Sequence, residues 1–329
     1  MTRKWQAVTG FSSGIDDRER EIAVNVQTRE AAREDRDAVR QAEYRSWSHQ
    51  LHPAWRVCFP LAATGLRLVL RRKLFWLLLG LAALNFLFLF ATIYLRAQVS
   101  AENPGVARFV DGVLHSVTGE GRSYRDFMFA QGTVTMLLLA FAGEMLIGGD
   151  HRQGGLTFYL SRRMAAWHYV LGKLLSIAAL VLLTTTVPAL ILFLQYGLLT
   201  NSLAYFRDNW RIVVGILGYG AVMAASLSLL LMALASWFPR TVPLVMSWAC
   251  VFVLLPAVGA LLSEVFDNRH WRLIMFWRNI RMLGTWCFGA LTREQDVVML
   301  PWAAGVVVAV GVVCLLALFP RIRAVKVVT

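Results

Sequence analysis

Long apolar stretches alternate with short polar segments through most of the chain. Six of them are long enough to form membrane-crossing helices, at residues 74–95, 127–149, 169–199, 212–238, 242–262 and 297–319. A helix of about 20 apolar residues crosses a bilayer core of about 30 Å. The pattern therefore predicts an all-α, polytopic membrane protein with six transmembrane helices, and Pro188 predicts a kink in the long third stretch.

The part of the chain before the first stretch has a different pattern. Residues 55–72 mix apolar positions with four arginines. This is typical of an N-terminal amphipathic helix in the membrane interface and equally of a basic flank of the first span, so both interpretations stay open. Residues 1–54 alternate acids and bases with little apolar content, which predicts a solvated helix or disorder. The expected organisation is a charged tail (1–54), a membrane domain (55–323) and a short C-terminal tail (324–329).

Composition supports the membrane class. Hydrophobic residues make up 57% of the 329 residues and charged residues 16%, whereas soluble domains carry about 25% charged residues. The 33 Lys and Arg residues exceed the 20 Asp and Glu residues, which gives a net charge of +13. Because the bases flank the apolar stretches, membrane lipid is their expected partner and nucleic acid is not.

Six spans place both termini on the same side of the membrane. Basic residues in the connecting segments are nearly balanced between the two sides, so the cluster Arg71-Arg72-Lys73 beside the first span decides the orientation. The predicted topology has both termini in the cytoplasm, in a multi-pass protein of the plasma (inner) membrane. The segment between the second and third spans is then cytoplasmic.

That segment is short and polar. Residues 150–167 mix an acid, several bases and aromatic side chains, and residues 156–160 fit a short amphipathic helix. A helix in this position is a lever, because a soluble partner that pushes it tilts both attached spans as rods. An ordinary connecting loop is the alternative.

The same segment carries a sequence motif. The motif consists of an acid followed by glycine, then a Tyr-Leu-Ser-Arg block, then a Tyr-x-x-Gly-Lys block. Its residues in this chain are Asp150, Gly155, Tyr159, Leu160, Ser161, Arg162, Tyr169, Gly172 and Lys173. In this motif, in the six spans and in the basic stretch before them, the chain resembles the permeases of ABC-2 type transporters over about residues 55–323. Many members carry proline after the first arginine of the block, where this chain has Arg163.

The resemblance implies a division of labour between subunits. Two permease subunits, identical or different, form the membrane path, and two separate ATPase subunits bind ATP and Mg²⁺ and drive export. Coupling runs through residues 150–167 and through the helix before the first span. The residues expected to couple to the ATPase are Asp150, Arg152, Tyr159, Leu160, Arg162 and Arg163.

The chain itself is not expected to be an enzyme or to hold a cofactor. Gly172-Lys173 is followed by Leu174, and Trp167 stands where a phosphate-binding loop needs glycine. The histidines and the four cysteines have no metal-ligand spacing. The alternatives are a non-transporting scaffold or regulatory subunit of such a complex and, less favoured, an intramembrane enzyme, because no apolar stretch holds two suitable catalytic residues.

Two polar side chains stand out inside the apolar stretches. Asn85 lies in the first, and Glu144 lies near the cytoplasmic end of the second. An acid inside a membrane is costly and is a functional candidate by default. Pairing with a base at the helix end is the structural alternative for Glu144.

The predicted outer segment, residues 264–296, interleaves aromatic and basic side chains. Its candidate residues are Trp271, Trp277, Arg278 and Arg281. Tryptophan favours the headgroup level of a bilayer, so short helices in the outer interface explain the pattern. A sharper hypothesis is that the arginines, with Arg269 and Arg272, meet an anionic or lipidic substrate during export.

Overall fold

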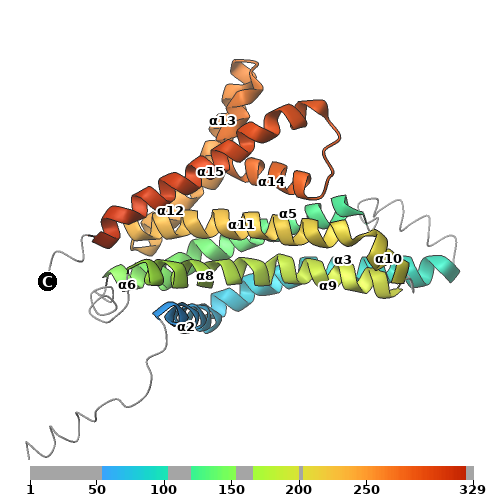
Figure 1. Ribbon diagram of the computed structural model, residues 1–329, viewed down its shortest axis with the longest axis horizontal. Coiled ribbons are helices and arrows are strands. Elements are labelled where there is room, and N and C mark those ends of the chain that lie inside the picture. The colour runs from blue at the N-terminus through green and yellow to red at the C-terminus, as the bar shows by residue number, and fades with distance from the viewer. Residues whose placement is uncertain (1–53, 103–119, 153–165, 200–202, 324–329) are drawn as a thin grey trace, which may run out of the picture. The chain divides into compact units, whose positions relative to one another are not determined.

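The computed structural model describes residues 54–102, 120–152, 166–199 and 203–323, and every regular element in them is a helix (Figure 1). In chain order these are η1 (Ala54–Val57), α2 (Cys58–Leu70), α3 (Lys73–Glu102), α5 (Gly121–Gly143), η2 (Glu144–Gly148), α6 (Gly149–Arg152), α8 (Ala166–Thr184), α9 (Thr186–Leu199), α10 (Leu203–Asp208), α11 (Trp210–Trp237), α12 (Thr241–Ala249), η3 (Cys250–Leu254), α13 (Leu255–Val265), η4 (Arg269–Ile274), α14 (Phe276–Cys287) and α15 (Glu294–Arg323). The segments η1 and η4 are 3₁₀ helices, and η2 and η3 are wider π-helical turns.

Six helical stretches in this part of the chain are long and apolar enough to cross a membrane. They cover Lys73–Leu95, Gly121–Gly148, Trp167–Leu199, Trp210–Trp237, Thr241–Val265 and Glu294–Pro320. The prediction of an all-α fold with six such helices is therefore confirmed. The second stretch begins at Gly121 instead of residue 127, because Arg122, Arg125 and Asp126 interrupt its apolar pattern without interrupting the helix.

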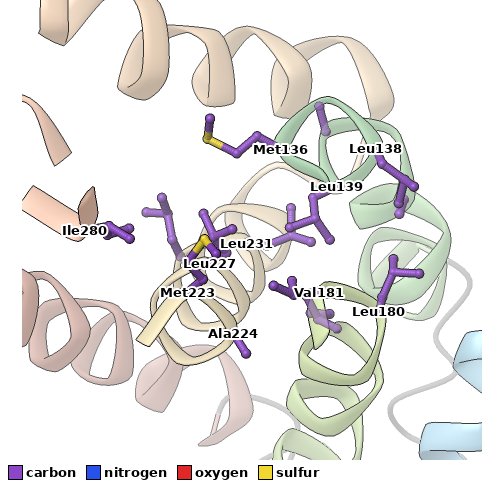
Figure 2. Packing of buried hydrophobic residues seen from close by; sticks show 14 of the residues in the cluster. Met136, Leu138, Leu139, Leu180, Val181, Met223, Ala224, Leu227, Leu231 and Ile280 are labelled. Carbon is purple, nitrogen blue, oxygen red and sulfur yellow. The ribbon is translucent and has the colours of Figure 1, made fainter. Parts of the chain in front are cut away.

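Helix α11 lies at the centre of the bundle and contacts α5, α8, α9, α14 and α15. Its Met223, Leu227 and Leu231 are fully buried and gather with Leu139 of α5 and Val181 of α8 (Figure 2). In contrast, α3, α13 and α15 expose many large apolar side chains. Lipid is a suitable solvent for such faces, so this burial pattern fits a helical membrane protein whose interior is held together by close packing.

Polar side chains also join the spans inside the bundle. Asn85 of α3 donates its amide to Gln131 Oε1 of α5 at 2.9 Å, and Gln131 Nε2 donates to the Ala82 carbonyl at 3.1 Å. Thr135 of α5 and Thr184 of α8 share a hydrogen bond of 2.8 Å. Such bonds between membrane helices contribute about 0.6 kcal/mol each on average. Asn85, a candidate polar residue, is thus a structural link between α3 and α5.

The third span is interrupted at Thr185, between α8 and α9. Pro188 follows in the first turn of α9, and a proline ring prevents a regular hydrogen bond to the carbonyl four residues earlier, here that of Thr184. The Thr185 hydroxyl donates to the Val181 carbonyl at 2.7 Å. The interruption lies three residues before the proline from which the kink is predicted.

Candidate functional site

The segment that carries the sequence motif connects α6 to α8. Four of its candidate residues lie outside the described residues: Tyr159, Leu160, Arg162 and Arg163. Asp150 and Arg152 belong to α6, which continues the second span beyond η2. The third span begins with α8 at Ala166. The structure therefore describes both helices from which the segment departs.

Asp150 joins these two helices. Its Oδ2 lies 2.7 Å from Lys173 Nζ and accepts a hydrogen bond of 2.9 Å from the Tyr169 hydroxyl. Lys173 Nζ also donates to the Leu146 carbonyl of η2 at 2.5 Å, and it lies 5.7 Å from the centre of the Tyr169 ring. Tyr169 and Lys173 are four residues apart on α8 and so share one face of that helix. Three residues of the motif thus meet at one point.

Burial makes this contact strong. The Lys173 side chain is 6% exposed and the Asp150 side chain 23% exposed. A buried ammonium group is stable only with partners, and here it has a carboxylate, a backbone carbonyl and an aromatic ring. Removing one partner of a buried ion pair costs about 3–5 kcal/mol, because the other charge remains unpaired. Removing either partner of this contact between the two helix ends that flank residues 153–165 is therefore costly.

Helix α2 packs closely on the first turns of α8. Gly172 lies so near α2 that a Cβ atom there would be 2.7 Å from Leu61 Cδ2. Ser176, one turn later, donates its hydroxyl to the Ala62 carbonyl at 3.1 Å, and a Cβ at Gly65 would lie 2.6 Å from Ser176 Oγ. Small residues four apart allow this close approach. Gly172, another motif residue, thus connects the helix predicted before the first span to the third span.

Glu144 ties the second span to the connection between α11 and α12. Its carboxylate accepts a hydrogen bond from the Thr241 hydroxyl at the start of α12. At the other end of η2, a Cβ on Gly148 would lie 2.6 Å from the Pro239 carbonyl oxygen. We refer to Glu144, Asp150, Tyr169, Lys173 and Thr241 as the polar junction.

The predicted outer residues lie in two different surroundings. Trp277 of α14 stacks on Phe129 of α5 with ring centres 5.1 Å apart, and a Cβ on Gly132 would lie 2.7 Å from its indole. Gly132 is about 16 Å along α5 from its first residue, at 1.5 Å per residue. Trp277 therefore packs against the side of the second span, about three turns from its first residue. Trp271 is exposed and lies beside Phe266 at the end of α13.

The four arginines of this region form two groups. Arg269 donates a hydrogen bond to Gln295 of α15, and Arg272 donates one to Ser263 Oγ of α13. Arg278 and Arg281 line a cavity of about 500 Å³. The other arginines in its lining are Arg122, Arg125 and Arg293. The sequence reasoning missed these three residues. The Arg-x-x-Arg spacing at 122/125 and 278/281 is a weak signal, because it also occurs at 269/272, outside the lining, and does not include Arg293.

Comparisons with known proteins assign no family to the chain, so its class rests on the fold alone. No protein-family model matches the sequence, and no curated protein matches it either. Within the described residues, no group of three or more His, Cys, Asp or Glu side chains is arranged to hold a metal ion. The fold defines a helical protein with six helices able to span a membrane, and the polar junction is its candidate functional site.

Proposed function

We propose that the chain is the permease subunit of an ATP-driven exporter of the ABC-2 type. In this proposal it pairs with a second permease subunit and with separate ATPase subunits, which bind ATP and Mg²⁺. The observation that carries the proposal is the contact of Asp150 with Tyr169 and Lys173. These positions belong to the motif by which the chain resembles that family, and their contact gives the motif a mechanical role.

The mechanism follows from how the helix ends are connected. A force on residues 153–165 acts on α6 and α8 together, because the ion pair between Asp150 and Lys173 prevents them from separating. Helix α2 follows α8, since Gly172 and Ser176 hold it in close contact. The bond between Glu144 and Thr241 passes the displacement on to α12. One nucleotide-driven movement at the junction thus shifts several spans as connected rods.

The proposal fixes the orientation of the spans. The polar junction and both termini lie in the cytoplasm, where ATP is available, and α2 lies along the cytoplasmic face of the plasma (inner) membrane. Arg56 of η1, Arg67 of α2 and the exposed Trp55 and Phe59 suit such an interface, because basic side chains face headgroups and aromatic rings face acyl chains. The end that carries Arg278 then faces outward.

Co-purification with an assay of ATP hydrolysis tests this proposal. The tagged full-length chain is isolated from its native membranes in a mild detergent, alongside Lys173→Met and the matched control Gly80→Ala, whose Cβ would meet no other atom within 4 Å. We expect an ATP-binding polypeptide to co-purify with the wild type and with Gly80→Ala and to hydrolyse ATP, and we expect Lys173→Met to reduce the activity severalfold. A wild-type preparation without an ATP-hydrolysing partner would contradict the proposal.

A further inference from the structure

The arginine cavity lies at the end of the second span opposite the polar junction. It opens beside the start of that span, at Gly121, whereas the junction lies beside its last residue, Gly148. Its lining comes from α5, from α14 and from the segment that leads into α15. The charged residues in this lining are Arg122, Arg125, Arg278, Arg281, Arg293 and Asp296.

The cavity has a defined geometry because Asp126 connects its two helices. Asp126 Oδ2 lies 2.9 Å from Arg125 Nη2 of the same helix, and Asp126 Oδ1 lies 3.2 Å from Arg281 Nη2 of α14. The Arg281 guanidinium also lies 4.5 Å from the centre of the Phe129 ring. Residues three apart share a helix face, so each helix presents a pair of arginines to the same space.

Positive charge is in excess in this space. Among the described residues, Arg122, Arg278 and Arg293 have no carboxylate within ion-pair distance. Burial lowers the pKa of Arg278, and the positive charge of Arg272 acts in the same direction, while Asp296 opposes it. A guanidinium group stays protonated at neutral pH, so these charges remain and repel one another. An anion in the cavity would relieve this repulsion.

We propose that the arginine cavity binds a phosphate group. Planar guanidinium forks match phosphate oxygens and donate paired hydrogen bonds to them, and several forks around one space provide more donors than a single carboxylate needs. The volume is in the range of small-ligand sites, about 300–1,000 Å³, but the lining is charged instead of apolar. A lipid headgroup and free phosphate share this chemistry. The proposal stands independently of the ATPase-coupled function.

The test uses the purified full-length chain in a non-ionic detergent. Native mass spectrometry measures binding of phosphatidylglycerol, with diacylglycerol as the probe without phosphate, and calorimetry measures binding of inorganic phosphate. The test variant is Arg122→Gln with Arg278→Gln. The matched control is Arg207→Gln with Arg240→Gln, which removes two exposed arginines that do not line the cavity.

We expect the test variant to bind the phosphate probe at least about tenfold more weakly than the wild type, since charge-assisted hydrogen bonds are lost, and the control to bind like the wild type. Binding of phosphatidylglycerol alone identifies a lipid headgroup site, and binding of inorganic phosphate that competes with the lipid identifies a site for free phosphate. Equal affinity of the wild type and the test variant, or no binding of either probe to the wild type, overturns the proposal. If the glutamine variant fails to fold, Arg122→Lys with Arg278→Lys replaces it in the test. This variant keeps both positive charges and loses the guanidinium forks. Unchanged affinity for the phosphate probe would contradict recognition of phosphate by guanidinium.

Discussion

Lys173 Nζ lies 2.7 Å from Asp150 Oδ2, and this ion pair connects the end of the second span to the start of the third. The two residues stand on opposite sides of residues 153–165 in the sequence. The pair is strengthened by the Tyr169 hydroxyl and the Leu146 carbonyl, which bond to its carboxylate and its ammonium group. These contacts hold the end of the second span against the start of the third.

The ion pair predicts a strong energetic coupling. Lys173→Met leaves the Asp150 carboxylate without its buried partner, and Asp150→Asn leaves the ammonium group without its counter-charge. We expect each single variant to lose about 3–5 kcal/mol of stability and the double variant to lose clearly less than their sum, with a coupling of at least about 1 kcal/mol. Denaturant titration in detergent micelles measures these differences. Additive losses would show that the two charges do not stabilise each other.

Close packing of α2 on α8 predicts that glycine is required at residue 172. Gly172→Ala places a Cβ 2.7 Å from Leu61 Cδ2 and 3.2 Å from the Cys58 carbonyl oxygen, so the Leu61 side chain must shift and α2 must give way slightly, at a cost of about 1–3 kcal/mol. Gly80→Ala in α3 meets nothing within 4 Å and should leave stability unchanged or raise it slightly. Thermal unfolding of both variants compares them directly. Equal midpoints for the two variants would contradict a tight contact between α2 and α8.

Glu144 is expected to matter for coupling more than for folding. Glu144→Gln keeps an oxygen that accepts the Thr241 hydroxyl proton but removes the negative charge. We predict normal assembly and a severalfold lower rate of ATP hydrolysis in the co-purified complex, because the charge at the end of the second span contributes to the moving contact. Glu264→Gln, an exposed acid at the end of α13, is the matched control. An unchanged rate for Glu144→Gln would remove this residue from the mechanism.

The sequence predicted the spans well because their signal is local. Membrane-crossing helices need long apolar runs, and these are visible without knowledge of what packs on what. The contact between Asp150 and Lys173 was not visible in this way. Both residues were recognised as motif positions, but the motif does not say that one residue pairs with the other across an intervening segment.

The contacts of residues 264–296 were also hard to predict, because they join residues that lie far apart in the sequence. The alternation of tryptophan and arginine in this segment is typical of an interfacial helix, and it does not reveal that Trp277 packs against Gly132 of α5. The residues that Trp277 of α14 contacts, Gly132 and Phe129, lie far away in the sequence. The cavity likewise combines Arg278 with Arg122, which no local pattern relates.

Cysteines at residues 287 and 292, near the end of α14, should differ in reactivity. Burial raises the pKa of the Cys287 thiol, so at pH 8 it forms less thiolate than an exposed cysteine does. Thr292 is exposed and lines the arginine cavity, where nearby positive charge favours a thiolate. In variants with a single cysteine, we expect alkylation to be severalfold slower at Cys287 than at Thr292→Cys, and the Cys287 rate to keep rising with pH above about 8.5. Equal rates would show that α14 does not shield Cys287.

Site-specific photo-crosslinking in native membranes tests the central claim most directly. A crosslinking amino acid replaces Tyr159 in one variant and Thr292, which lines the arginine cavity, in another. The account predicts that residue 159 crosslinks to a separate polypeptide that azido-ATP also labels, and that residue 292 does not. Absence of an ATP-binding partner at residue 159, or its capture from residue 292 instead, would contradict the account.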